Sequence, residues 1–134
     1  MGRRATGPFD VKLNPQPTYN TDQTALLGRM SIDKQFRGDL EGTSKGEMLT
    51  AGSAIKGSAG YVAIERVNGT LDGKAGGFAL QHTGTMDRGM ASLVITVVPD
   101  SGVGDLEGLV GNMSITIVDG RHFYVLDYSL PGAR

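Results

Sequence analysis

Cysteine is absent from the 134 residues, so the chain has no disulfides and no thiolate chemistry, which suits a reducing cytosol. No apolar run approaches the roughly 20 residues of a membrane-spanning helix. Arg3 and Arg4 are not followed by the apolar segment of a signal peptide. We therefore expect a cytoplasmic protein without a membrane partner.

An excess of one charge is also missing. Thirteen basic and 14 acidic residues give a net charge of −1, and no long run has one sign. Proteins that bind nucleic acid use basic surfaces that neutralise phosphates, and single-strand binders add exposed aromatic side chains. The composition therefore predicts no nucleic-acid partner.

The sequence motifs of several common catalytic and binding sites do not occur. There is no Gly-x-Ser-x-Gly elbow, no phosphate loop ending in Gly-Lys-Ser/Thr and no calcium loop with alternating acidic residues. The two histidines and the glutamates within predicted strands lack the close spacing of metal-ligand motifs. We predict no metal and no cofactor.

Glycine, in contrast, is abundant, with 21 residues, and it marks a repeat. The pattern Gly-x-Leu-acid-Gly occurs at residues 38–42, 69–73 and 104–108, each time between segments that resemble strands. A turn sequence repeated between strands indicates one supersecondary unit, a hairpin, used several times.

Alternating apolar residues predict eight strands in the all-β class. They cover about residues 9–13, 25–37, 43–51, 61–68, 78–86, 93–98, 113–118 and 121–130. Short connections predict antiparallel pairing, and eight strands can close into a barrel that removes exposed edges. We therefore predict a single domain over residues 1–134, an eight-stranded antiparallel β-barrel with loose tails at 1–6 and 131–134. A two-sheet sandwich is the main alternative.

Two histidines are candidates for acid–base chemistry. His82 shares a strand face with Phe78 and Leu80, and His122 shares one with Tyr124 and Leu126, so both are predicted to point into the barrel. The alternative is that each is a buried histidine satisfied by a hydrogen bond.

Two glutamates lie within predicted strands. Glu47 and Glu65 have apolar neighbours, and a buried carboxylate is costly unless it is paired. If Glu65 shares the lumen with a histidine, its charge favours the imidazolium and prepares a general acid. Glu65 and Arg66 equally fit an exposed pair on the surface.

Tyr61, Tyr124 and Tyr128 supply hydroxyl groups that fit a small-molecule pocket. The alternative is a barrel filled by side chains, with the tyrosines packed in its core. Residues 93–98 are apolar on both faces apart from Thr96, and no helix is predicted to cover them. We therefore predict a homo-oligomer, a dimer or trimer, with a subunit contact over Val94 and Val98 or over the opposite face.

Several segments resemble a known family. They are residues 60–67, 69–73, 78–86, 98–102 and 104–108, followed by His122-Phe123-Tyr124 and Tyr128. Over about residues 8–130 the chain resembles bacterial domain-of-unknown-function family 3224, which is similar in fold to the allene oxide cyclase-like barrels that include dirigent proteins. The resemblance implies an allene oxide cyclase-like eight-stranded barrel with a lumen. It does not imply allene oxide cyclase activity, because no cyclase catalytic set maps onto these residues.

The sequence thus predicts a barrel that binds a small, largely apolar metabolite in its lumen. If it is an enzyme, we expect a cofactor-independent isomerase or cyclase, which works mainly by holding a flexible substrate in a dry cavity. The acid–base candidates are His82, His122 and Glu65. The candidates for lining the pocket are Tyr61, Tyr124, Tyr128 and Glu47. The alternatives are a non-enzymatic carrier and an interaction module with a filled barrel.

Overall fold

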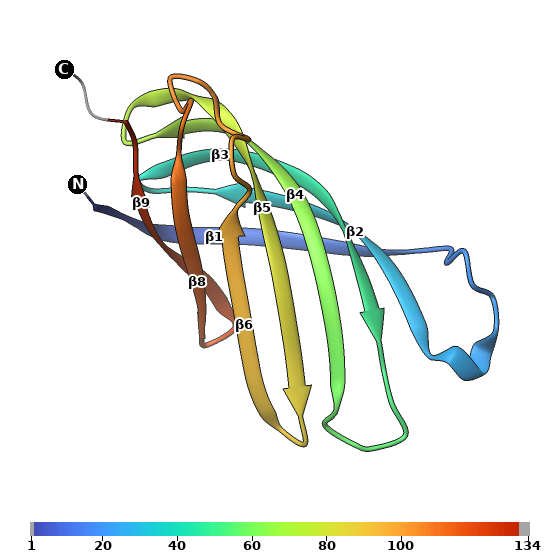
Figure 1. The fold of residues 1–134 in the computed structure, drawn as a ribbon. Coiled ribbons are helices and arrows are strands. Elements are labelled where there is room, and N and C mark those ends of the chain that lie inside the picture. Colours follow the sequence, from blue (N-terminus) through green and yellow to red (C-terminus); the bar gives the residue numbers. More distant parts are fainter. Residues whose placement is uncertain (1, 132–134) are drawn as a thin grey trace.

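Eight long antiparallel strands form a closed barrel in the computed structural model, which describes residues 2–131 (Figure 1). The strands are β1 (Arg3–Gln16), β2 (Leu27–Phe36), β3 (Leu40–Ala51), β4 (Ala59–Leu71), β5 (Lys74–Asp87), β6 (Met90–Val97), β8 (Val110–Val118) and β9 (Arg121–Ser129). A two-residue strand, β7 (Val103–Gly104), and a short 3-10 turn, η1 (Gln23–Ala25), complete the described elements. The predicted all-β barrel is therefore confirmed.

The strands close into a ring because β4 pairs with β5 in addition to the sheet order β4-β3-β2-β1-β9-β8-β6-β5-β7. This closure excludes the two-sheet sandwich. The junction between β6 and β8 is the shortest around the ring, with the two residue pairs Ile95–Met113 and Thr96–Asn112.

The first strand begins earlier than the sequence predicts. Residues 3–6, predicted as a loose tail, belong to β1, where Arg3 pairs with Tyr128 and Ala5 pairs with Leu126. The side chain of Ala5 is fully buried, but its neighbours show no apolar alternation that would reveal a strand. Of the predicted C-terminal tail, residues 132–134 lie outside the described part of the chain.

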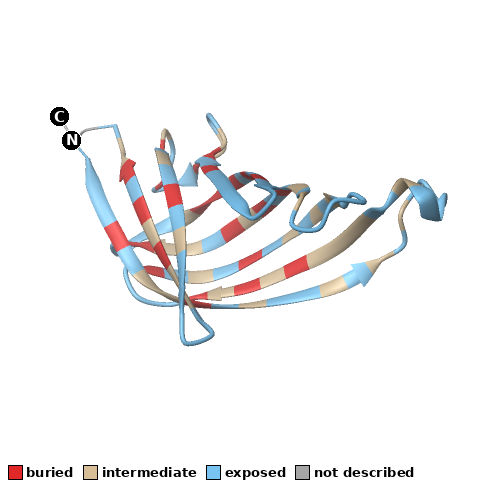
Figure 2. Ribbon diagram, turned by 90° about the horizontal axis from the view of Figure 1, so that it is seen from below, coloured by how far each residue is buried: buried red, intermediate tan, exposed pale blue. Residues whose placement is uncertain are grey.

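Alternate residues of each strand face the barrel interior, as expected for pleated strands. Figure 2 shows buried positions alternating with more exposed ones along the strands. The predicted inward faces of three strands are confirmed, since their members are buried at Phe78, Leu80, His82, Met113, Tyr124, Leu126 and Tyr128.

The three repeats close one end of the barrel. Their central leucines, Leu40, Leu71 and Leu106, are almost completely buried and belong to one core cluster. Leu40 pairs with Leu71 across β3 and β4, and β7 brings the third repeat to the start of β5. We call this closed end, formed by the three leucines with Phe36, Phe78 and Tyr124, the floor.

Tyrosines of β9 anchor the floor to the repeats. The Tyr124 hydroxyl accepts a hydrogen bond from the Leu40 backbone N–H (2.8 Å) and donates one to the Arg37 carbonyl (2.8 Å). The Tyr128 hydroxyl donates to the carboxylate of Asp72 in the second repeat. The repeated sequence therefore builds and fastens the end of the barrel at which the core is packed.

The opposite end of the barrel is open. By strand parity, Leu13, Met86, Leu93 and Ile117 face the same interior as the core, yet all four are exposed, with Ile117 at 63%. Residues 10–16 of β1 and 27–31 of β2 likewise include no buried position (Figure 2). We call these four side chains the mouth.

We predict that Leu71→Ala lowers the free energy of unfolding by about 2–5 kcal/mol, because it opens a cavity in the floor. Leu49→Ala is the matched control, since Leu49 is 55% exposed and Leu71 is fully buried. Chemical denaturation of both variants at low protein concentration measures the difference. Equal losses would contradict the assignment of the repeats to the packed floor.

Candidate functional site

A buried ionic cluster lies between the floor and the mouth. We call it the Glu65 cluster, and it consists of Lys34, Ser44, Glu65 and His82. The Glu65 side chain is 0% exposed. Its Oε2 accepts hydrogen bonds from Lys34 Nζ (2.7 Å) and His82 Nε2 (2.6 Å), and its Oε1 accepts one from Ser44 Oγ (2.6 Å).

Four neighbouring strands each contribute one member of this cluster. Lys34 of β2 pairs directly with Ser44 of β3, and Glu65 of β4 and His82 of β5 lie on the same inner surface. Gly46 is the cross-strand partner of Glu65, and a Cβ there would lie 2.6 Å from the Glu65 Cα. Glycine at position 46 therefore lets β3 approach β4 closely beside the cluster.

The cluster keeps Glu65 ionised. Burial by itself raises the pKa of this carboxyl, but the hydrogen bond from His82, the charge and hydrogen bond of Lys34 and the hydrogen bond from Ser44 outweigh it. The pKa of Glu65 falls from 4.5 to about 2. The Lys34 ammonium also lies over the rings of Phe9 (5.0 Å) and Phe36 (5.7 Å), whose faces attract a cation.

The ionised carboxylate fixes which nitrogen of His82 carries a proton. A carboxylate only accepts hydrogen bonds, so Nε2 must be the protonated nitrogen. Nδ1 has no hydrogen-bond partner among residues 2–131, yet in that part of the chain no fully buried side-chain nitrogen or oxygen lacks a partner. Nδ1 is therefore not completely buried, although the His82 residue is only 4% exposed. It is the nitrogen of His82 that is available to a ligand.

Tyr61 lies next to His82 on the side toward the mouth. The two ring centroids are 6.4 Å apart, and the Tyr61 ring covers Gly84, where any side chain would collide with it. Burial and the charge of Glu65 raise the pKa of Tyr61, so its hydroxyl stays protonated. No described residue hydrogen-bonds to this hydroxyl, which leaves it free to donate.

Three of the predicted site residues therefore lie together, namely Glu65, His82 and Tyr61. The predicted alternative of an exposed Glu65–Arg66 pair is wrong, because Glu65 is buried and Arg66 donates to the Ser101 carbonyl (3.0 Å). His122 is half-buried and contacts Phe9 (5.2 Å between ring centroids), whose ring also contacts Lys34. No hydrogen bond joins His122 to the Glu65 cluster in the described residues.

The other predicted pocket residues lie elsewhere. Tyr124 and Tyr128 belong to the floor and its anchors, and burial is the main cause that raises the pKa of each to about 12. Glu47 is on the outside of the barrel, where Arg29 Nε donates to it (2.7 Å). These three residues have structural partners of their own.

Sequence reasoning missed Lys34 and Ser44. Lys34 follows Asp33 and resembles part of a solvated charge pair, but it shares strand parity with Ile32 and Phe36. That parity was the available signal for an inward lysine. Ser44 carries no such signal, because its small polar side chain fits either face of a strand.

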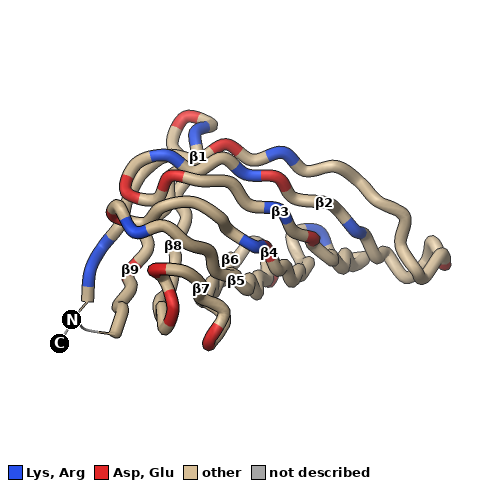
Figure 3. The backbone as a smooth tube through the Cα atoms, turned by 90° about the horizontal axis from the view of Figure 1, so that it is seen from above, with Lys and Arg blue, Asp and Glu red and all other residues tan. Residues whose placement is uncertain are grey.

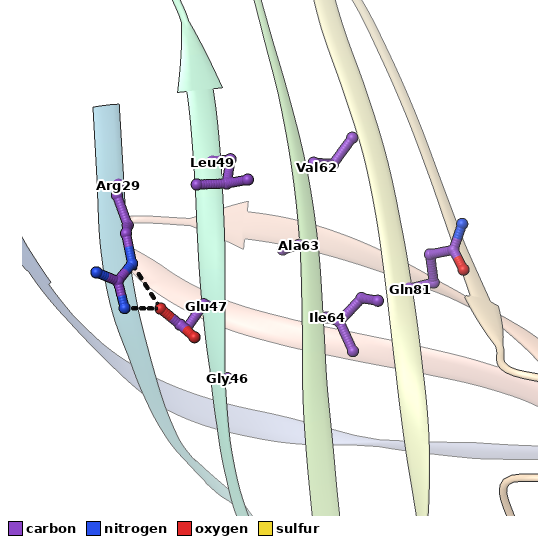
Figure 4. A pocket seen from close by; sticks show the side chains of 8 residues that line it. All are labelled: Arg29, Gly46, Glu47, Leu49, Val62, Ala63, Ile64 and Gln81. Atoms are coloured by element: carbon purple, nitrogen blue, oxygen red, sulfur yellow. Dashed lines mark hydrogen bonds and ion pairs between the residues drawn. The ribbon is translucent and has the colours of Figure 1, made fainter. Parts of the chain in front are cut away.

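An apolar groove of about 680 Å³ lies on the outer surface (Figure 4). Its apolar lining comes from Leu49, Val62 and Ile64, which we call the outer patch, and the Arg29–Glu47 pair borders it. Acidic and basic residues are mixed over the molecule and do not separate onto two sides (Figure 3).

Two other kinds of site receive no support. Residues 2–131 contain no group of three or more histidine, cysteine, aspartate or glutamate side chains placed to hold a metal ion. Within the same residues, no helix has the length and apolar character needed to cross a membrane.

The model of one protein family matches residues 5–128, and it is described as a protein of unknown function (DUF3224). The chain belongs to this family. Its fold is similar to the crystal structure of a DUF3224 protein of unknown function from Shewanella oneidensis MR-1, with 51% identity and a TM-score of 0.93. The alignment covers 99% of this chain and 100% of that one. No curated protein matches the chain. The resemblance to the DUF3224 family is thereby confirmed.

We predict that acid removes the contribution of Glu65 to stability. Because its pKa is lower in the folded state, the ionised carboxylate stabilises the fold fully above pH 4.5, and this stabilisation is lost as the pH falls toward 2. Glu65→Gln, which cannot titrate, should lose less unfolding free energy over this range than wild type, by about 3 kcal/mol.

Denaturant titrations at several pH values measure this difference. Glu47→Gln is the matched control, because its exposed ion pair contributes little. Parallel pH profiles for wild type and Glu65→Gln would show that Glu65 is not held ionised by its neighbours.

Proposed function

We propose that this DUF3224 protein binds a small, largely apolar molecule in the open half of its barrel, above the Glu65 cluster. The observation that carries the proposal is the exposure of inward-facing apolar side chains at the mouth, with Leu93 at 43% and Ile117 at 63%. Apolar surface left in water costs roughly 25 cal/mol per Å² relative to burial, so an apolar ligand gains by covering it.

The composition of the interior supports the same proposal. Met30, Met48 and Ala63 lie in register with His82 across β2 to β5, so the wall that continues from the histidine consists of flexible and small apolar side chains. The free polar groups next to the Glu65 cluster are His82 Nδ1 and, on the side toward the mouth, the Tyr61 hydroxyl. Small-molecule sites typically combine such apolar walls with a few placed polar groups.

The same geometry supports acid–base catalysis. Glu65 orients His82 as the carboxylate of a catalytic triad orients its histidine, and it would stabilise the imidazolium that forms when Nδ1 takes a proton. A cofactor-independent isomerase needs one such group and a cavity that holds the substrate. A carrier would use the same cavity and return its ligand chemically unchanged.

Binding in the lumen predicts chemical-shift changes at specific methionine methyl groups. With the methionine methyls labelled, we expect 2-decanone, decanol, decanoic acid or cyclohex-3-enone to shift the signals of Met30 and Met48. Met113, which is 5% exposed and belongs to the packed core cluster, is the internal control and should not move. If no member of this set at millimolar concentration shifts Met30 or Met48, the proposed function is wrong.

A second candidate function, an interaction module, is favoured by the outer patch. Leu49, Val62 and Ile64 are each at least half exposed, and Val94 on β6 adds a further exposed apolar side chain on the outside. Contiguous exposed apolar surface of this kind is typical of protein contacts. The occupant that we propose is a second copy of the chain, because the Arg29–Glu47 pair beside the patch gives a two-fold contact both signs of charge.

We predict that Val62→Asp prevents self-association, because it places a charge in the centre of the outer patch. Sedimentation velocity over a range of concentrations compares this variant with wild type. Thr43→Asp, an exposed outward position on β3 that does not line the groove, is the control. A wild-type protein that stays monomeric, or a Val62→Asp protein that still associates, would contradict this candidate.

A further inference from the structure

We infer that His82 and Tyr61 act as a base and a hydrogen-bond donor that isomerise apolar carbonyl compounds through an enol or enolate. The substrate class is a ketone or enone with a C–H bond beside its carbonyl group. This inference rests on the proposed function, since it names the chemistry of the same cavity.

The base is His82 Nδ1. Its partner nitrogen Nε2 is held by Glu65 at 2.6 Å, and Nδ1 is the ring nitrogen that has no hydrogen-bond partner in the described residues and is not completely buried. The carboxylate does not compete for the substrate, because Lys34, Ser44 and His82 already occupy its oxygens. Glu65 is therefore a positioning residue, and His82 is the group that contacts the reacting C–H bond.

The donor is the Tyr61 hydroxyl. It lies on the neighbouring strand, one inward position closer to the mouth than Ala63, the cross-strand partner of His82. Gly84 leaves room for the ring, since a Cβ there would lie 2.3 Å from Tyr61 Cε1. A hydroxyl without a protein partner can donate to a substrate oxygen on which negative charge develops, which is the interaction that stabilises enolates.

The charge of the cluster suits an anionic intermediate. The charges of Lys34 and Glu65 cancel, so proton transfer to His82 leaves one net positive charge beside the enolate. In the apolar interior this attraction is stronger than in water. The alternative histidine, His122, has neither a carboxylate partner nor a free tyrosine beside it in the described residues.

The reaction balances without another reactant. The C–H bond beside the carbonyl breaks, its proton moves to Nδ1, and its electron pair forms a C=C bond while the carbonyl π pair moves to oxygen. That oxygen accepts a hydrogen bond from Tyr61. In an enone, the imidazolium can return the proton to the far carbon of the conjugated system, which moves the double bond. It can also return a proton to the original carbon, which inverts the configuration of that carbon or exchanges its hydrogen.

Cyclohex-3-enone is the probe for this reaction, because its conversion to cyclohex-2-enone produces an ultraviolet absorbance. We expect the protein to accelerate the conversion and, in D₂O, to exchange the hydrogens beside the carbonyl. His82→Gln, whose amide can still donate to Glu65, should lower the rate at least about 100-fold. Tyr61→Phe should lower the rate about 10² to 10³-fold with little change in Kd.

His122→Gln is the matched control and should leave the rate unchanged, and thermal unfolding checks that each variant is folded. If the ketone shifts the Met30 and Met48 methyls but is neither isomerised nor exchanged, the inference is wrong and the proposed binding stands. If only other members of the probe set shift these methyls, the substrate class is wrong. A rate that is unaffected in folded His82→Gln or Tyr61→Phe also overturns the inference.

Discussion

A carboxylate without exposed surface must be neutralised from within the protein, because an unpaired buried charge costs several kcal/mol. Glu65 meets this constraint with one group from each of three other strands. A shift of one residue in any of the four strands would turn its member outward and leave the charge unpaired. The register of β2 to β5 and the ionisation of the cluster therefore depend on each other.

Apolar side chains are packed at the floor of the barrel and exposed at its mouth. The repeats bring Leu40, Leu71 and Leu106 into one floor. The Tyr124 hydroxyl holds the first of them in place, since it accepts a hydrogen bond from the Leu40 N–H and donates one to the Arg37 carbonyl. Because the core is complete at this end, the side chains of the mouth are not needed to close the barrel. The Glu65 cluster lies at the boundary, with a packed core on one side and the unpartnered polar atoms of His82 and Tyr61 on the other.

The residue pattern within single strands predicted which side chains face the barrel interior. The alternation around His82 and Tyr124 gave the correct inward faces, and the cost of burying a strand glutamate pointed to Glu65. Contacts of Glu65 with Lys34 and Ser44 join residues 31 and 21 positions apart, so they follow only from the register. The same limit explains Glu47, which is a strand glutamate like Glu65 but lies on the outer face of β3.

The protonation of the His82 ring tests the central claim most directly. Long-range proton–nitrogen NMR correlations of the imidazole distinguish its two nitrogens. We predict that Nε2 carries a proton whenever the protein is folded and Glu65 is ionised. A neutral ring with its proton on Nδ1 and a bare Nε2 would contradict the account, because His82 would then not donate to an ionised Glu65.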